Sequence, residues 1–386
     1  MNMNGPSPSP SPVHDLDLDQ VRKEINQLDS ELVQLLNKRA HLSIAVGRLK
    51  DSGQESVFKP FREKDVLDRI LSANTGPLPA DHLQAIYREI LSSSRSLQRP
   101  QRVVYLGPEG TFSYYAGLHY LGQASSFTPC PGLEEVFRSV RTRQAELGII
   151  PLENSLQGSV GQSLDLFLRF EVFIQAEIFC RISHSLLSSS DNLADIQVVY
   201  SHPQALQQCT SWLNSHLPQA RIVPMPSTAA GAKRVQTEPG AAAIAHPGLA
   251  RSLQLKVLHT GIEDLPENWT RFLIIGPDHP PPGNRDKTSL VFTLPDQPGS
   301  LATVLNLLAR EGVNMKKLES RPSRGERWQY VFFADVECDL SSQEYAQLMQ
   351  DLEKTSHSLR ILGSYPNGPS LDLASFPAGE ETDGQE

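Results

Sequence analysis

At 386 residues the chain is too long for one ordinary domain, and about 150 residues per domain suggests two or three. Its composition of 39% hydrophobic and 20% charged residues is that of a soluble globular protein. No run approaches the ~18 consecutive apolar residues of a membrane span. The formal net charge of −9 argues against nucleic acid as a partner, so cations gathered in one place must serve a local purpose.

The cysteines and the N-terminus indicate where the protein works. Residues 1–14 are rich in Ser and Pro and lack the apolar core of a signal peptide, which predicts a disordered tail. The four cysteines lack CxxC spacing, which argues against a disulfide framework and against a structural zinc site. We therefore expect a cytoplasmic protein with no metal and no other cofactor.

The segment 15–100 has the pattern of a helical domain. Apolar residues recur at steps of four and three over 21–49, which predicts a long amphipathic helix. Further helices are predicted at 59–72 and 80–98. Arg39 occupies a seam position of the first helix, and Lys50 returns to nearly the same face at 3.6 residues per turn.

Several cations would thus share the interior of these helices. The residues predicted to gather there are Arg39, Lys50, Arg62, Ser94 and Gln98, with Glu63 as the only nearby acid. Buried cations are unfavourable unless an anion joins them, which suggests an anionic ligand. The alternative is that they reach solvent or pair with acids on neighbouring helices. Arg22 lies about 25 Å along the helix from Arg39, so it could contribute only from a second copy of the chain.

Four stretches resemble the all-helical chorismate mutase family, namely Val21-Arg22-Lys23-Glu24-Ile25, Lys38-Arg39, Val46-Gly47-Arg48-Leu49-Lys50 and Arg62-Glu63-Lys64. The resemblance implies an intertwined dimer of three-helix chains that rearranges chorismate. It also implies a substrate site formed by Arg22 of the second chain with Arg39, Lys50, Arg62, Glu63, Ser94 and Gln98. Arg39, Lys50 and Glu63 would be catalytic, because donors in such a site stabilise charge on the ether oxygen as its bond breaks. Lys59 departs from the family pattern, since several members carry an acid there.

The segment 102–277 alternates predicted strands and helices, which indicates an open parallel or mixed sheet, long enough for two lobes. Its first strand runs into Gly107-Pro108-Glu109-Gly110, and Thr111 and Ser113 begin a helix. Free N–H groups at a helix start favour an anion, here a carboxylate, although a purely structural turn is the alternative. Ligands of such sheets bind beyond the carboxyl ends of the strands, where Glu153 and Ser201 should emerge.

A second signal is Asn268-Trp269-Thr270-Arg271-Phe272, which leads into an apolar strand. Strand alternation predicts Thr270 and Phe272 on one face of the sheet and Arg271 on the other. On its own, this stretch could serve only pairing or capping.

Three stretches together resemble the hallmark motifs of the prephenate dehydratase family, namely Gly107 to Ser113, Pro151 to Ser155 and Thr270 to Phe272. In that family the threonine of the last motif is essential. The resemblance implies that Thr270 donates a hydrogen bond to the leaving ring hydroxyl as carbon dioxide departs. The implied substrate site comprises Thr111, Ser113, Glu153, Asn154, Ser155, Ser201, Thr270, Arg271 and Phe272.

After a predicted linker at 278–287, the segment 288–366 reads as a third domain. The expected strands and helices follow the order βαββαβ of a ferredoxin-like fold, at 289–294, 300–310, 313–319, 328–337, 341–357 and 359–364, with a hairpin at 323–327. The last residues, 367–386, are acidic and are predicted to be a disordered tail.

Asp296 to Leu301 and Glu319 to Pro322 resemble an ACT domain of the phenylalanine-sensing kind, although the first turn could be structural. The resemblance implies an effector site between paired domains, formed by Gly299, Ser300, Leu301, Glu319, Ser320, Arg321 and Pro322. In this order, the three segments resemble the bifunctional chorismate mutase/prephenate dehydratase family of phenylalanine biosynthesis. The implied partners are chorismate, prephenate, the effector L-phenylalanine and further copies of the chain. Two alternatives remain, an arogenate dehydratase and a non-catalytic sensor of aromatic metabolites.

Overall fold

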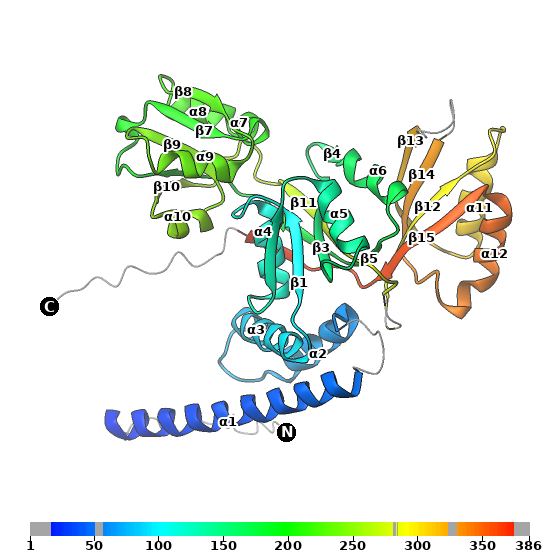
Figure 1. Cartoon of the computed structure of the whole chain (residues 1–386), viewed down its shortest axis with the longest axis horizontal. Helices are drawn as coiled ribbons and strands as arrows, with labels where there is room; N and C mark the ends of the chain where they lie inside the picture. The colour runs from blue at the N-terminus through cyan, green and yellow to red at the C-terminus, as the bar shows by residue number, and fades with distance from the viewer. Residues whose placement is uncertain (1–16, 51–56, 281–282, 284, 323–329, 374–386) are drawn as a thin grey trace, which may run out of the picture.

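The computed structural model describes residues 17–50, 57–280, 283, 285–322 and 330–373, except for the side chain of Lys50. They form a helical module, a two-lobed α/β domain and an α+β domain in chain order (Figure 1). The predicted multidomain architecture is therefore confirmed. The predicted tail at 1–14 and the predicted hairpin at 323–327 lie outside the described residues.

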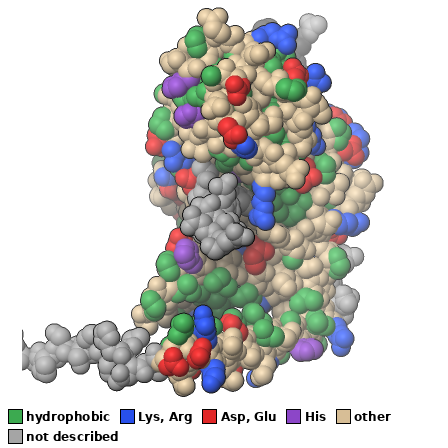
Figure 2. All heavy atoms as spheres, turned by 90° about the vertical axis from the view of Figure 1, so that its left-hand side faces the viewer, with side chains coloured by type: hydrophobic (Ala, Val, Ile, Leu, Met, Phe, Trp, Pro, Cys, Tyr) green, Lys and Arg blue, Asp and Glu red, His purple; other side chains and the backbone are tan. Residues whose placement is uncertain are grey.

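The helical module contains the three predicted helices, α1 (Leu18–Lys50), α2 (Pro60–Ala73) and α3 (Ala80–Gln98). α1 has 33 residues, which is about 50 Å of helix. Its C-terminal part packs on α3, where a Cβ on Gly47 would lie 2.9 Å from the carbonyl oxygen of Gln98. Its N-terminal part leaves Leu28 and Leu35 exposed by 63% and 64%. Hydrophobic side chains consequently show on the surface over the helical module, in the lower part of Figure 2.

The first lobe of the α/β domain is built on a mixed seven-stranded sheet with the order β16-β5-β11-β3-β1-β2, in which β4 pairs with β3. Its strands are β1 (Arg102–Leu106), β2 (Ser126–Cys130), β3 (Leu147–Asn154), β4 (Gly158–Ser159), β5 (Phe173–Arg181), β11 (Trp269–Gly276) and β16 (Ser370–Asp372). The helices are α4 (Phe112–Leu121), α5 (Leu133–Arg141) and α6 (Gly161–Arg169). β11 runs antiparallel to both neighbours, which places the start of β11 beside the end of β3.

The second lobe is an insertion between β5 and β11, with a five-stranded sheet of order β10-β6-β9-β7-β8. Its elements are β6 (Ser185–Ser188), η1 (Leu193–Asp195), β7 (Val198–Ser201), α7 (Pro203–Gln208), α8 (Thr210–His216), β8 (Arg221–Pro224), α9 (Thr228–Val235), β9 (Ala241–Ala245), α10 (Gly248–Leu253) and β10 (Lys256–Thr260). The chain crosses between the lobes twice, and the two crossing segments are joined where Ile262 N donates to His184 O at 3.1 Å. The predicted two lobes are thus confirmed.

The C-terminal domain has the predicted ferredoxin-like order. Its elements are β12 (Lys287–Thr293), α11 (Ser300–Arg310), β13 (Met315–Pro322), β14 (Tyr330–Val336), η2 (Gln343–Tyr345), α12 (Ala346–Thr355) and β15 (Ser358–Tyr365). The antiparallel sheet has the order β13-β14-β12-β15, and α11 and α12 pack on one of its faces. Its other face shares a core with the α/β domain, where Val291, Phe333 and Leu362 pack with Phe167 and Ile174.

The prediction of a disordered tail from residue 367 is wrong for the part that the structure describes. Ser370 to Asp372 form β16, which pairs in parallel with the edge of β5, and Leu373 is fully buried. Two apolar residues in an otherwise polar stretch, Leu371 and Leu373, supply the contact with the core of the α/β domain. The free backbone groups of the β5 edge supply the hydrogen bonds. Residues 374–386 lie outside the described part.

Candidate active sites and effector site

The helical module brings three of the predicted mutase residues together at the contact of α1 with α3. The Arg39 guanidinium donates hydrogen bonds to Ser94 Oγ and, at 3.5 Å, to the carbonyl oxygen of Ile90. Gln98 lies one turn after Ser94 and donates to its backbone oxygen at 3.2 Å. This cluster places a half-buried cation beside polar groups that could orient an anion.

The other predicted mutase residues lie elsewhere in the same chain. Arg22, 66% exposed, lies 3.8 Å from Asp19 near the far end of α1. Arg62 is exposed on the first turn of α2. The Lys50 side chain is outside the described structure. Their part in substrate binding stays a prediction.

Glu63 is not the partner of the Arg39 cluster that the sequence suggested. Its carboxylate pairs with Arg95, a buried residue that the sequence analysis did not single out. Arg95 also donates to Gln101 Oε1 at 3.1 Å and to Leu121 O. One position along a helix turns a side chain by about 100°, so Arg95 faces the α/β domain while Ser94 faces α1. A buried guanidinium needs an acid, and Glu63 supplies it.

In the α/β domain, the second and third dehydratase motifs meet at Thr270. This residue is the second of β11, is 8% exposed and lies opposite Asn154 at the end of β3. Asn154 Nδ2 donates to Thr270 Oγ1 at 3.0 Å and to Asn268 Oδ1 at 2.7 Å. The register of two antiparallel strands thus unites residues that are 116 positions apart.

The orientation of the Asn154 amide follows from the backbone. The N–H groups of Leu156 and Gln157 donate to Asn154 Oδ1 at 3.1 and 3.2 Å. A backbone N–H can only donate, so the oxygen of this amide faces the loop and its nitrogen faces Thr270. Thr270 Oγ1 therefore accepts from Asn154. Its own proton is engaged by no other described residue and is available to a ligand.

The second lobe contributes polar groups that the sequence analysis missed. Asn268 Nδ2 donates to Gln208 Oε1 at 3.2 Å, and His184 Nε2 lies 2.8 Å from the same oxygen. Asn268 belongs to the stretch that carried the third motif, so its position was a usable signal. Gln208 and His184 carry no local signal of this kind, because they meet Asn268 only through the insertion of the second lobe.

Aromatic rings pack beside these polar groups. The ring of Phe112 lies edge-on to both His184 and His246, with ring centres 5.5 Å apart in each pair. Tyr115 stacks on His246 at 3.7 Å. Burial lowers the pKa of His246 to about 3, so this imidazole is neutral at pH 7. Its Nε2 bonds to the carbonyl oxygen of Leu373 at 3.0 Å, which joins the C-terminal segment to the second lobe.

Several predicted dehydratase hydroxyls are satisfied by the chain's own backbone. Thr111 donates to Leu106 O at 3.0 Å, Ser155 to Glu267 O at 3.2 Å and Ser201 to Ile244 O at 2.6 Å. Ser113 and Phe272 are buried in the first lobe. The part of these residues in substrate binding stays a prediction.

Arg271 and Glu153 face away from Thr270, toward the C-terminal domain, so their part in substrate binding stays a prediction. Arg271 bonds to Glu177 Oε2 at 2.8 Å and to Asp335 of the C-terminal domain. Glu153 pairs with Lys317 of that domain at 2.9 Å. Alternation along the strand causes this, as the sequence predicted for Arg271. Burial alone would lower the pKa of Arg271, but Asp335 and Glu177 are among the neighbours that raise it.

The effector residues expected in the C-terminal domain divide into two groups. Strand register aligns Thr293, Val331 and Arg321 across the sheet, so the Gly299 turn and the end of β13 emerge at one end. Gly299 has a φ of +88°, a conformation that favours glycine, and Ser300 and Leu301 follow it in the first turn of α11. Ser320 and Pro322 are exposed.

Glu319 and Arg321 instead point toward the α/β domain. Arg321 Nε donates to Asp165 Oδ1 at 2.8 Å, and Glu319 accepts from Ser159. These two therefore serve a contact between domains in the same chain.

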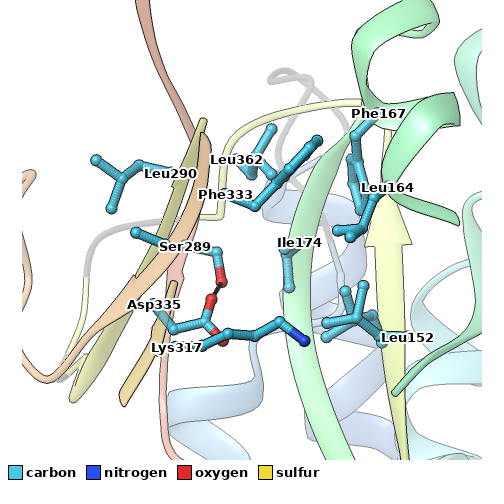
Figure 3. Close-up of a pocket in the computed structure, with 12 residues that line it drawn as sticks. Leu152, Leu164, Phe167, Ile174, Ser289, Leu290, Lys317, Phe333, Asp335 and Leu362 are labelled. Atoms are coloured by element: carbon cyan, nitrogen blue, oxygen red, sulfur yellow. Dashed lines mark hydrogen bonds between the residues drawn. The ribbon is translucent and has the colours of Figure 1, made fainter. Parts of the chain in front are cut away.

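A small cavity of about 20 Å³ lies between the sheet of the C-terminal domain and the first lobe (Figure 3). Leu152, Leu164 and Phe167 line it from the α/β side, and Ser289 and Asp335, hydrogen-bonded to each other, line it from the other. Such a volume holds about one water molecule. It is too small to hold an amino acid.

Two further observations concern cofactors and membranes. Within the described ranges, no group of His, Cys, Asp or Glu side chains has an arrangement suited to a metal ion, and no helix is long and apolar enough to cross a bilayer. Cys130, Cys180, Cys209 and Cys338 are all buried free thiols.

Comparison with known proteins gives the same division of the chain. Family models match at 21–99 for chorismate mutase type II, at 103–280 for prephenate dehydratase and at 288–354 for the ACT domain. Among solved structures, a quorum quenching acylase, GqqA, matches with a TM-score of 0.64 and 30% identity, covering 70% of this chain and 99% of its own. The prephenate dehydratase from Arthrobacter aurescens in complex with L-Phe matches with a TM-score of 0.63 and 33% identity, covering 69% of this chain and 90% of its own.

The relatives that match along most of the chain carry both enzyme names. A bifunctional chorismate mutase/prephenate dehydratase from Aquifex aeolicus is 38% identical over 354 residues, which cover 91% of this chain and 98% of the relative. The chain therefore belongs to the bifunctional chorismate mutase/prephenate dehydratase family.

Proposed function

We propose that the chain catalyses two consecutive steps of L-phenylalanine biosynthesis. The helical module rearranges chorismate to prephenate, and the α/β domain converts prephenate to phenylpyruvate. The C-terminal ACT domain binds L-phenylalanine and lowers the dehydratase rate. The observation that carries the second activity is the Thr270 hydroxyl, whose oxygen accepts from Asn154 and whose proton is left for a ligand.

The dehydratase step needs no cofactor in this arrangement. As the ring carboxylate leaves as carbon dioxide, its electron pair enters the ring and expels the hydroxyl group on the opposite carbon, which makes the ring aromatic. Negative charge grows on the departing oxygen, and a donor already aimed there stabilises it. A threonine hydroxyl is too weak an acid to give up its proton freely at pH 7, so Thr270 acts as a hydrogen-bond donor.

Thr270→Val tests this role. Asn154 Nδ2 keeps Asn268 Oδ1 and Trp269 O as acceptors at 2.7 and 3.3 Å, so the change leaves no donor unpaired. We expect the dehydratase kcat to fall about 10²- to 10³-fold, as for loss of one such donor, while the mutase rate of the same protein stays unchanged. Thr270→Ser, which keeps the hydroxyl, is the control. A valine variant with nearly full dehydratase activity, or with both activities lost, would contradict the proposal.

The two alternatives are separated by the wild-type protein. An arogenate dehydratase would show a higher kcat/KM with arogenate than with prephenate. A sensor would bind prephenate and release no phenylpyruvate. Separate assays of phenylpyruvate formation from chorismate and from prephenate therefore decide among the three.

For the mutase, we propose a site shared by two chains. Arg39, Lys50, Ser94 and Gln98 come from one chain and Arg22 from the other, with Arg62 and Glu63 at its edge. The exposed Leu28 and Leu35 of α1 support a paired state, because an apolar helix face of this length is normally covered. A second copy of α1 is the partner that would cover it, giving a homodimer or a larger homo-oligomer. A monomer at assay concentration in sedimentation would refute this.

For regulation, we propose that L-phenylalanine binds beside the Gly299 turn and the exposed Ser320 and Pro322, between paired ACT domains. β13 is the edge strand of its sheet, so its free backbone groups can pair with a second domain. Glu319 and Arg321 would not contact the effector directly; they would link the effector site to the α/β domain through their bonds to Ser159 and Asp165. A dehydratase rate that does not respond to L-phenylalanine would contradict this.

A further inference from the structure

A chain of hydrogen bonds runs from Thr270 across both lobes to a buried histidine. It passes from Thr270 to Asn154 at 3.0 Å, to Asn268 at 2.7 Å, to Gln208 at 3.2 Å and to His184 at 2.8 Å. The first three residues stand on the first lobe, and Gln208 ends α7 in the second. His184 lies in a segment that crosses between the lobes. This chain of hydrogen bonds therefore connects Thr270 on the first lobe to Gln208 on the second lobe.

The direction of every bond in this chain is determined by backbone groups. Because Leu156 and Gln157 donate to Asn154 Oδ1, Asn154 Nδ2 must donate to Asn268 Oδ1. Asn268 then presents its nitrogen to Gln208, whose oxygen accepts. A carbonyl oxygen cannot donate, so His184 must carry its proton on Nε2. Burial lowers the pKa of His184, which agrees with a neutral ring.

Two donors therefore hold the oxygen of Gln208 and turn its nitrogen away from them. That nitrogen, His184 Nδ1 and the neighbouring Ser185 Oγ are buried and have no hydrogen-bond partner among the described residues. Buried polar groups are nearly always paired in native proteins, so such a set points to a ligand that completes it. The Gln208 amide and the Thr270 hydroxyl would then both donate, from different lobes, to one molecule that is rich in oxygen acceptors.

We propose that His184 is a positioning residue of the dehydratase site: it holds the Gln208 side chain so that the amide N–H groups face the substrate. This proposal rests on the proposed dehydratase function. His184 is 2% exposed, and its backbone N donates to Glu263 Oε2 at 2.8 Å. The His184 backbone is thus anchored to Glu263 on the other crossing segment, and the His184 ring can orient the Gln208 side chain. The alternative is that the His184 ring serves only to pack against Phe112.

Two variants of His184 separate these roles. His184→Gln places an amide N–H near the position of Nε2, whereas His184→Leu keeps much of the volume and removes the donor. We expect His184→Leu to lower the dehydratase kcat/KM at least about tenfold, the usual order for one hydrogen bond, and His184→Gln to restore most of the loss. The mutase rate should not change. Equal loss in both variants would overturn the proposal.

A double-mutant cycle tests whether His184 acts through Gln208. If it does, His184→Leu should have little further effect on kcat/KM in a Gln208→Ala background. Fully additive losses would assign His184 a packing role and overturn the proposal. Cys209→Ala is the matched control, since Cys209 is the fully buried neighbour of Gln208 and is no part of the chain of hydrogen bonds. It should leave kcat/KM near the wild-type value.

A measurement without activity covers the case in which His184→Leu fails to fold. In the full-length protein labelled with 15N-histidine, with His184→Gln used for assignment, the His184 ring should show a protonated Nε2 and an unprotonated Nδ1. The opposite tautomer would refute the proposal. If wild-type protein shows this tautomer and binds prephenate but forms no phenylpyruvate, the proposed function fails instead. If Thr270→Val loses dehydratase activity while His184→Leu keeps full dehydratase activity, only the inference about His184 fails.

Discussion

Arg271→Met is expected to destabilise the contact between the α/β domain and the ACT domain. The Arg271 side chain is 7% exposed and pairs with Glu177, 0% exposed, and Asp335, 7% exposed. Without Arg271, Glu177 keeps Lys287 at 2.7 Å, but no other cation pairs with Asp335 among the described residues. One buried carboxylate is then uncompensated, which typically destabilises a protein by about 3 to 5 kcal/mol.

The charge explanation has its own control. Asp335→Asn removes the stranded charge and keeps a group that can bond to Ser289. We therefore expect the double variant Arg271→Met with Asp335→Asn to recover most of the loss. Urea unfolding, followed together with the dehydratase rate and its response to L-phenylalanine, measures the effect. A single variant within about 0.5 kcal/mol of wild type, or a double variant less stable than the single one, would refute the reasoning.

Three further predictions follow from other parts of the chain. Ending the chain after Gly368 removes β16 and the buried Leu373, so the free energy of unfolding should fall, by about 1.5 to 3 kcal/mol for the leucine alone, and the melting temperature should fall with it. An unchanged melting curve would show that this strand is dispensable. Heterodimers of Arg22→Ala and Arg39→Ala chains should regain mutase activity, because one of their two sites is intact, and verified heterodimers without activity would exclude a shared site. Burial lowers the pKa of His246 to about 3 in the folded protein, so this ring stays uncharged, whereas in the unfolded chain it takes up a proton below about pH 6.5. The free energy of unfolding should therefore be highest above that pH and fall toward pH 3 by up to about 1.4 kcal/mol per pH unit. His246→Gln should make this pH dependence shallower, as a series of denaturation curves over pH would show.

Local pattern predicted most of the architecture. The spacing of apolar residues located α1, α2 and α3, because the apolar residues of an amphipathic helix recur every three or four positions along the sequence. The alternation of strands with helices indicated the two lobes, and the βαββαβ order indicated the ACT domain. Thr270, the residue that the dehydratase proposal depends on, was found from a short motif on one strand. Asn154 was found in the same way.

The tertiary structure alone decided which partners the polar residues have. Glu63 pairs with Arg95, and His184 meets Gln208, through contacts between elements that no local period encodes. The C-terminal residues looked disordered because a three-residue strand such as β16 carries almost no signal by itself. It forms only because the edge of β5 offers backbone groups and a buried place for Leu373. The sequence by itself thus determined most of the elements, their order and the chemistry of the motifs, since these depend on near neighbours. Pairing of charges, domain contacts and the chain of hydrogen bonds across the lobes depend on residues far apart in the chain, so only the folded molecule decides them.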